Sequence, residues 1–146
     1  IANEVLQLYM AEMNEDMRNL YLAGYSMPIT SEEVLKQRTD MIYKAFSKAF
    51  PEQELKDFYE TEIASMGIMR AYMTVPCDMY FTIEAKAKRL VTMLLRIYKA
   101  EDEKITEALE FIEKIDFEAV AKKAVQSVFK ELDIKTNSPK GEKLCS

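Results

Sequence analysis

A single carboxylate, Glu62, interrupts an apolar line in the middle of the sequence, and it is the residue best placed for acid–base chemistry. A carboxylate buried on an apolar helix face needs a partner, and loss of hydration would raise its pKa. Glu62 could thus act as a catalytic acid, but no histidine and no second acid at fixed spacing accompany it. We favour an ion pair with an Arg or Lys of a neighbouring helix, or a place at the edge of a helix bundle. The line has spacings of four and three residues, which puts it on one helix face: Leu55, Tyr59, Glu62, Met66, Met69 and Met73.

The absence of histidine from the whole chain excludes much chemistry. Histidine is the most frequent general base and a common metal ligand, and it activates Ser and Cys nucleophiles. Acids cluster at residues 12–16 and 101–103, but neither cluster has the spacing of a calcium loop, and the chain has no Gly-rich phosphate loop. We therefore predict no catalytic residues, no metal site and no cofactor, and we expect that the protein is not an enzyme.

Methionine and aromatic residues are abundant, with ten Met, eight Tyr and seven Phe. Methionine is polarizable and adaptable, so a stripe of it could line a cavity for an apolar ligand or a groove for a peptide. The same stripe at helical spacing is more simply explained as core, and we favour the core. The candidate lining of such a cavity is the helix face described above: Tyr59, Glu62, Met66, Met69 and Met73.

A basic stretch without acids lies between residues 85 and 100. A basic helix beside aromatic residues could contact nucleic acid or anionic lipid. The net charge of −5 opposes both partners, and cations balanced by neighbouring acidic helices are the plainer explanation. A docking site for an acidic protein is the third interpretation, and we predict these residues as the interaction surface: Lys86, Lys88, Arg89, Arg96 and Lys99.

The two cysteines, Cys77 and Cys145, fit neither a C-x-x-C motif nor a zinc spacing. A disulfide between them would tie the C-terminal tail to the middle of the chain if the protein is exported. We favour two unpaired thiols and keep the disulfide as the alternative.

Helical periodicity dominates the chain, and its three Gly and four Pro are too few for the turns of a β-sandwich or barrel. Capping residues and proline mark where helices begin. The predicted helices are residues 2–22, a segment opened by the capping box TSEE (30–33), one opened by PEQE (51–54) and ending near Met73, one capped by Asp78 and ending near Ala100, one opened by EDEK (101–104), and one capped by Asp116.

The sequence thus predicts an all-α, single-domain bundle of five to six helices over residues 1–134, followed by a polar, flexible tail over residues 135–146. The longest apolar run, residues 90–95, is short and interrupted by Thr92, so we expect no transmembrane segment. Because the chain begins at Ile1 rather than at methionine, we interpret it as a processed or trimmed protein whose native N-terminus lies outside the sequence.

The stretch AFSKAFPEQELKDFYETEIASMG, residues 45–67, carries a family resemblance. Together with Pro76 it resembles a bacterial family of small exported helical proteins, domain of unknown function twenty fifty-nine. The sequence departs from the family pattern by placing Phe58-Tyr59 one turn early and by having Ala64-Ser65 where the family has Ser-Pro. The resemblance implies export and a helical fold rather than a reaction. The matching residues are Phe46, Lys48, Phe50, Glu54, Leu55, Lys56 and Gly67.

These observations lead to one functional expectation and one alternative. We expect a non-enzymatic protein–protein interaction module of the bacterial periplasm or secreted fraction, which binds an unidentified protein through the basic surface or an exposed groove of Met and aromatic residues. The alternative is a carrier that holds an apolar or lipid-like small molecule in a cavity lined by Met and aromatic residues. Nucleic acid is not an expected partner.

Overall fold

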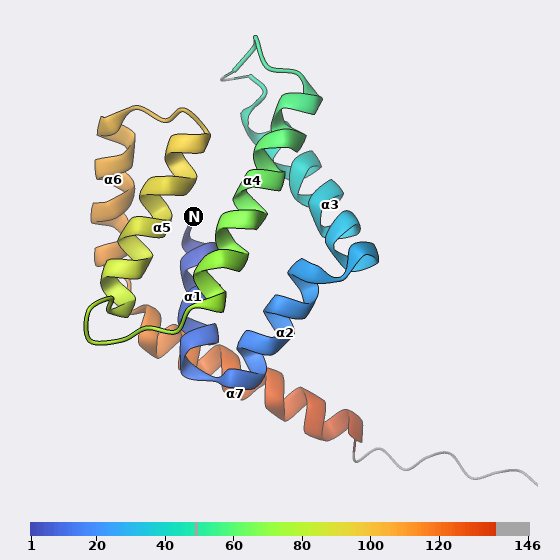
Figure 1. The fold of residues 1–146 in the computed structure, drawn as a ribbon, viewed down its shortest axis with the longest axis vertical. Helices are drawn as coiled ribbons and strands as arrows, with labels where there is room; N and C mark the ends of the chain where they lie inside the picture. Colours follow the sequence, from blue (N-terminus) through green and yellow to red (C-terminus); the bar gives the residue numbers. More distant parts are fainter. Residues whose placement is uncertain (49, 137–146) are drawn as a thin grey trace, which may run out of the picture.

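Seven helices make up the described part of the chain, and Figure 1 shows their arrangement. The computed structural model describes residues 1–48 and 50–136, with residues 28–30 and 132–136 described by their backbone alone. The all-α class is confirmed. The predicted number of helices, five to six, is too small because the segment predicted as the first helix forms two helices. The helices are α1 (Ala2–Met13), α2 (Glu15–Ser26), α3 (Pro28–Phe46), α4 (Leu55–Thr74), α5 (Ile83–Ile97), α6 (Asp102–Glu113) and α7 (Phe117–Thr136).

Asn14 divides the first predicted helix. Its backbone is extended, with φ −146° and ψ 122°, and its side-chain oxygen accepts a hydrogen bond from the backbone N–H of Met17 at 2.9 Å. Asparagine is favoured at this position because it satisfies a backbone donor that has no partner within the helix. The apolar stripe predicted over residues 2–22 therefore continues on two helices that point in different directions (Figure 1).

Two other helices begin at residues that we did not predict. α3 begins at Pro28, in the first-turn position that proline favours, so the TSEE segment lies within the helix instead of capping it. α4 begins at Leu55 rather than at Pro51, because Glu54 and Asp57 form the capping box. In this box Oδ2 of Asp57 accepts a hydrogen bond from the N–H of Glu54 at 2.7 Å. Pro51 lies in the preceding turn.

The start of α5 also differs from the prediction. Thr82, not Asp78, caps it, and its hydroxyl accepts the N–H of Ala85 at 3.4 Å. The predicted starts of α6 and α7 are confirmed, and Asp116 Oδ1 accepts the N–H of Ala119 at 2.9 Å. α7 includes residues 135–136, where we predicted the start of the tail. Residues 137–146 of that tail lie outside the described residues.

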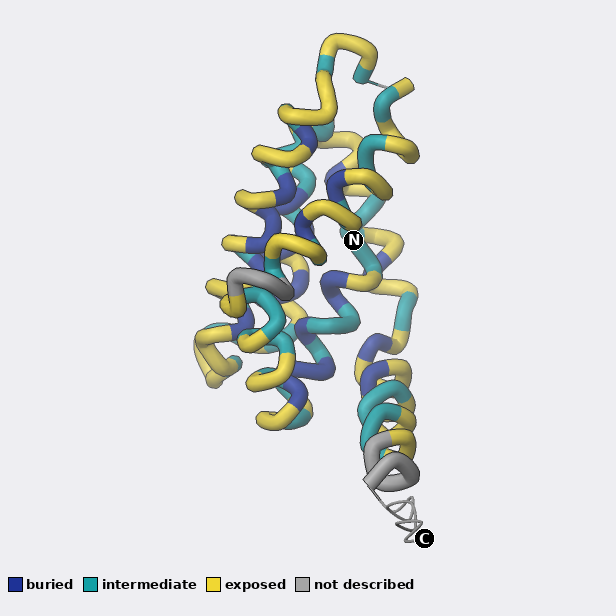
Figure 2. The backbone as a smooth tube through the Cα atoms, turned by 90° about the vertical axis from the view of Figure 1, so that its right-hand side faces the viewer, coloured by how far each residue is buried: buried dark blue, intermediate teal, exposed yellow. Residues whose placement is uncertain are grey.

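The core is built around α1, which contacts α2, α4, α5 and α7. The main cluster joins inner faces of α1, α4 and α5 with Ile112 of α6 and Phe117 at the start of α7. A second, smaller cluster of Met10, Met17 and Ala121 joins α1, α2 and α7. Figure 2 shows the buried residues along the faces that the helices turn toward one another. The main cluster includes Val5, Leu8, Met69, Met73, Leu90, Val91 and Leu94.

Most of the predicted methionine stripes are core, as we favoured. Met66, Met69 and Met73 of α4 are buried, with 8%, 1% and 0% of their surface exposed. Met10 and Met17 are buried as well, whereas Met13 is 39% exposed because the chain turns at Asn14 just after it. In the described part of the chain, no helix has both the length and the apolar character needed to cross a bilayer.

Candidate functional site

The loop between α4 and α5, residues 75–82, carries the two most exposed large apolar side chains of the described chain. Met79 is 82% exposed and Tyr80 is 88% exposed. The loop has a defined turn beneath them, because Oδ1 of Asp78 accepts hydrogen bonds from the N–H groups of Tyr80 at 2.8 Å and Phe81 at 2.9 Å. The N–H of Asp78 in turn donates to the carbonyl of Phe81 at 3.3 Å. The turn therefore presents Met79 and Tyr80 to solvent from a hydrogen-bonded base.

Glu12, at the end of α1, ties this loop to the body of the protein. Its Oε2 accepts the backbone N–H of Cys77 at 3.0 Å and the guanidinium of Arg18 at 3.1 Å. Its Oε1 accepts the ammonium of Lys86 at 2.6 Å, and Lys86 also donates to the carbonyl of Val75. Burial acts to raise the pKa of Glu12, but the hydrogen bonds from Lys86 and Cys77 outweigh it and hold that pKa below its usual range. One half-buried carboxylate thus fixes the loop at Cys77 directly and at Val75 through Lys86.

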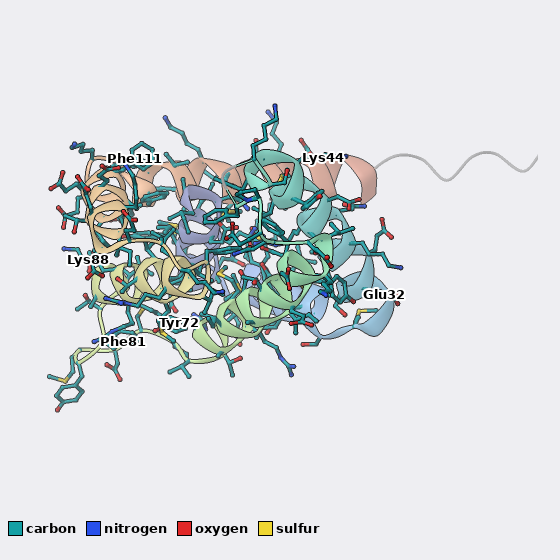
Figure 3. All side chains as sticks on the ribbon, turned by 90° about the horizontal axis from the view of Figure 1, so that it is seen from above. Glu32, Lys44, Tyr72, Phe81, Lys88 and Phe111 are labelled. Carbon is teal, nitrogen blue, oxygen red and sulfur yellow. The ribbon has the colours of Figure 1, made fainter. Side chains whose placement is uncertain are left out.

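Aromatic and sulfur-containing side chains of α4 and α5 continue the surface beside the loop. The rings of Tyr72 and Phe81 pack edge to face with centroids 6.2 Å apart, and Figure 3 shows the two residues next to each other. The hydroxyl of Tyr72 donates to the sulfur of Met93 at 3.1 Å. Burial raises the pKa of Tyr72, while the nearby guanidinium of Arg89 acts to lower it. We call the following residues the loop surface: Tyr72, Met79, Tyr80, Phe81, Arg89 and Met93.

The predicted basic surface needs one correction, at Lys86. Its side chain is completely buried against Glu12, so it cannot contact a partner. Sequence patterning missed this because Glu12 lies 74 residues away in the chain. A lysine can be buried when its charge is paired and its donors are satisfied, as they are here by a carboxylate and a carbonyl.

The other four cations of the predicted surface are exposed. Two of them pair with acids of α6: Lys88 with Glu113 at 2.5 Å and Arg96 with Asp102 at 3.1 Å. One interpretation of the sequence was that neighbouring acidic helices balance these cations. The structure confirms it for Lys88 and Arg96. Arg89 lies beside Tyr72, and Lys99 follows α5 with a positive φ of 56°.

The predicted cavity lining is spread over different environments. Met69 and Met73 belong to the main core cluster, whereas Tyr59, which is 36% exposed, and Met66 border a shallow surface groove between α3 and α4. Glu62 is completely buried. The five residues do not surround one common cavity in the described structure, because the core fills the space beside Met69 and Met73.

Glu62 forms the ion pair that its sequence position led us to favour. Its Oε2 accepts the Nε–H of Arg38 from α3 at 2.8 Å, and Nη1 of the same guanidinium donates to Oε1 of Glu4 at 3.1 Å. Burial acts to lower the pKa of Arg38, but the two carboxylates more than offset it and raise that pKa. This network joins α1, α3 and α4, so the geometry supports a structural role for Glu62.

The described part of the chain contains one of the two cysteines and no grouped metal ligands. No three Asp, Glu or Cys side chains among the described residues are grouped so that they could hold a metal ion. Cys77 is half-buried beside Glu12, and burial raises the pKa of its thiol. The other half of the possible disulfide, Cys145, lies outside the described residues.

Comparison of the chain with protein-family models, with curated proteins and with solved structures finds no significant match.

Sequence reasoning noted Tyr80 only as an aromatic residue near the basic helix, and it did not single out Met79, because it assigned both to a helix capped by Asp78. A signal for the loop was present in the segment PCDMYFT, residues 76–82. Asp78 and Thr82 are both good capping residues, and a helix capped by Thr82 leaves Asp78 to form a turn. That choice leaves two large apolar residues in a short loop, where a core cannot cover them.

Proposed function

We propose that this protein is a protein–protein interaction module and that the loop surface is its contact site. The observation that carries the proposal is the presentation of Met79 and Tyr80, 82% and 88% exposed, on a turn that is hydrogen-bonded within itself. Because neither side chain is buried, neither contributes to the hydrophobic core. Their exposure is therefore more easily explained by a partner than by the packing of this chain.

The composition of the loop surface supports this proposal. Tyr, Met, Phe and Arg are the residue types enriched at the centres of protein interfaces, and large aromatic anchors supply much of the binding energy. A hydrogen-bonded turn also loses less conformational entropy on binding than a disordered loop would. Glu12 adds to this order because it holds the N–H of Cys77 at 3.0 Å.

The partner that fits this surface has an apolar pocket with an acidic rim. Tyr80 is the residue that such a pocket would enclose. Arg89, beside Tyr72, supplies a cation at the edge of the surface. Lys88 lies on the same helix, although its charge is already paired with Glu113. An acidic rim would add specificity and speed of association more than affinity.

Site-specific photocrosslinking tests the proposal. p-Benzoylphenylalanine in place of Tyr80 should give one discrete crosslinked product in cells of the source organism. The matched control is the same amino acid in place of Phe111, which is 55% exposed on α6 and points away from the loop (Figure 3). Addition of Arg89→Glu should reduce the Tyr80 product, since the charge at the edge of the contact is reversed.

Two outcomes would contradict the proposal. One is the same set of products from positions 80 and 111, which would indicate random collision. The other is a position-80 product that Arg89→Glu and Met79→Ala leave unchanged. Both substitutions alter exposed side chains, so circular dichroism should show an unchanged fold, and a loss of product can be assigned to the surface.

We further propose a periplasmic or secreted location, which rests on the sequence resemblance around Phe46 and Phe50. Fractionation of source cells, with the intact mass measured under non-reducing conditions, tests it. Recovery from the exported fraction supports the location, and a mass lower by two hydrogens would add evidence for a disulfide between Cys77 and Cys145. Recovery from the cytoplasm alone would overturn it.

A further inference from the structure

An apolar pocket of about 210 Å³ lies at the end of the bundle far from the loop surface. It is bounded by α3, α4, α5 and the beginning of α1, which Figure 1 shows between α4 and α5. The pocket is open to solvent on one side and is separate from the methionine face predicted from the sequence. Its apolar wall includes Ile42, Phe46, Phe50, Phe58, Leu94 and Tyr98.

The pocket has one polar end, formed by Glu4, Arg38, Ser65 and the N-terminal ammonium of Ile1, which pairs with Glu4 at 2.8 Å. The guanidinium of Arg38 is already engaged there by two carboxylates, Glu62 at 2.8 Å and Glu4 at 3.1 Å. Glu62 lies on the face of α4 between Phe58 and Ser65, one helical turn from each. In the described structure no donor reaches the buried Oε1 of Glu62. The polar end therefore has acceptor capacity to spare, and both of its cations are already paired with carboxylates.

We propose that this pocket binds a small, uncharged apolar molecule that carries one hydrogen-bond donor, such as an aromatic or medium-chain alcohol. Its apolar part would contact the phenylalanine and leucine side chains, and its donor would lie at the Glu4–Arg38 end. The size is adequate, because a cavity of about 150 Å³ lined by Leu, Ile and Phe can hold benzene. Ligand pockets commonly combine an apolar wall with a few polar groups that fix the orientation.

The charge of the polar end disfavours a fatty-acid type of ligand. Glu4 and Glu62 are balanced by Arg38 and by the N-terminal ammonium of Ile1, so the group is neutral and each of its cations already has a carboxylate partner. A third carboxylate would give the group a net negative charge, and it would lose hydration without gaining an unpaired cation. The same reasoning favours a hydroxyl, which can donate to a carboxylate at little desolvation cost. Selection of alcohol over acid is thus the signature of this site.

Hexan-1-ol and hexanoate provide a matched pair of probes, since they share a chain length and differ in charge. Titration of each into the protein, followed by methyl NMR signals of Ile42 and Leu94, should give saturable shifts with hexanol. Hexanoate should bind at least about tenfold more weakly, which is the change expected from one poorly paired charge. Ala100→Phe, which places a ring in the pocket, should weaken hexanol binding by about tenfold or more.

Ala71→Phe is the control variant, because Ala71 is exposed on α4 and lies outside the pocket. It should leave hexanol affinity unchanged, and thermal unfolding should show that both variants are folded. Shifts at Ile42 in the unmodified protein test the site even if Ala100→Phe is unstable. The proposal is overturned if hexanol gives no saturable shift, if hexanoate binds as well as hexanol, or if Ala100→Phe and Ala71→Phe bind hexanol equally.

Discussion

At the scale of single residues, the ion network around Glu12 gives its carboxylate more partners than it gives the ammonium of Lys86. Glu12 is shared by three donors, from Lys86, Arg18 and the backbone of Cys77. Lys86, by contrast, has one anionic partner and one carbonyl. Removal of the carboxylate therefore leaves a completely buried ammonium without a counter-charge, whereas removal of the ammonium leaves a carboxylate that is still satisfied.

This asymmetry predicts different costs for two substitutions of similar size. Glu12→Leu should lower the free energy of unfolding by about 3–5 kcal/mol, the usual cost of leaving a buried charge unpaired. Lys86→Met should cost about 1–2 kcal/mol, because Arg18 and Cys77 still bind Glu12. Urea denaturation followed by circular dichroism measures both. Lys88→Met, which alters an exposed pair, should cause no measurable change. Equal losses for the first two variants would show that the network is not organised around Glu12.

The stability contributed by Glu12 should also depend on pH. Its pKa is lowered in the folded protein from an ordinary value of 4.5, despite an opposing effect of burial, mainly by the hydrogen bonds from Lys86 and Cys77. Below that ordinary value the unfolded chain binds more protons than the folded one, so acid favours unfolding. The contribution is thus complete above pH 4.5 and is lost as the pH falls through the folded-state pKa.

The measurement is the difference in unfolding free energy between the parent protein and Glu12→Gln from about pH 3 to pH 7. This difference should be constant at the neutral end and should shrink on acidification. A difference that grows as the pH falls would mean that the folded protein raises the pKa of Glu12, contrary to the geometry.

Some of the residue-level chemistry could be predicted and some could not. Glu62 could be predicted to need a cation, because a carboxylate on an apolar line at helical spacing has few alternatives. Lys86 gave no such signal, since it lies in a run of cations and a helix face with a lysine is usually solvated. Its burial depends on Glu12, and sequence separation of this size leaves no local pattern.

At the scale of helices, Asn14 decides how the N-terminal third of the chain folds. Its side chain caps α2 while its extended backbone ends α1. Asn14→Ala should lower the unfolding free energy by about 1 kcal/mol, because the N–H of Met17 loses its acceptor. Thermal or urea denaturation measures this, with Asn19→Ala on the exposed face of α2 as a control that should change little. A more stable Asn14→Ala protein would indicate that one continuous helix is the better arrangement.

Helix boundaries were predictable only where a single capping residue was available. Asp116 and the acids before α6 had no competitors, and these starts are confirmed. Two helices each had two plausible starts a few residues apart, and local preference allows either one. The pairs are Pro51 and Glu54 for α4, and Asp78 and Thr82 for α5. In the structure the later residue caps each helix: Glu54 forms the capping box with Asp57, and the hydroxyl of Thr82 accepts the N–H of Ala85.

At the scale of the whole molecule, the two proposed sites lie at opposite ends of the same helix. Phe58, in the pocket, and Tyr72, on the loop surface, are both in α4. Fourteen helical residues correspond to a separation of roughly 21 Å along the axis. The buried core of α1, α4 and α5 lies between them. The two proposed sites share no residue, so substitutions can alter one of them without changing the side chains of the other.

The second core cluster predicts that the molecule unfolds in two parts. Beyond Ala121, α7 packs through half-buried residues such as Val125, Val128 and Phe129 onto the cluster of Met10 and Met17, and Figure 1 shows this end of the helix running away from α5 and α6. Helices held by few buried contacts open more readily than the main core. Backbone amides of residues 122–131 should therefore exchange hydrogen faster than those of residues 87–94 in α5.

Met17→Ala sharpens this prediction, because it removes a buried side chain from the second cluster only. Hydrogen exchange followed by mass spectrometry should show a further loss of protection in residues 122–131, with residues 87–94 little changed. Met73→Ala, in the main cluster, should instead lower protection throughout, because this core supports the whole fold. If both variants lowered protection uniformly, the two clusters would belong to one cooperative unit, and α7 would be as firmly held as α5.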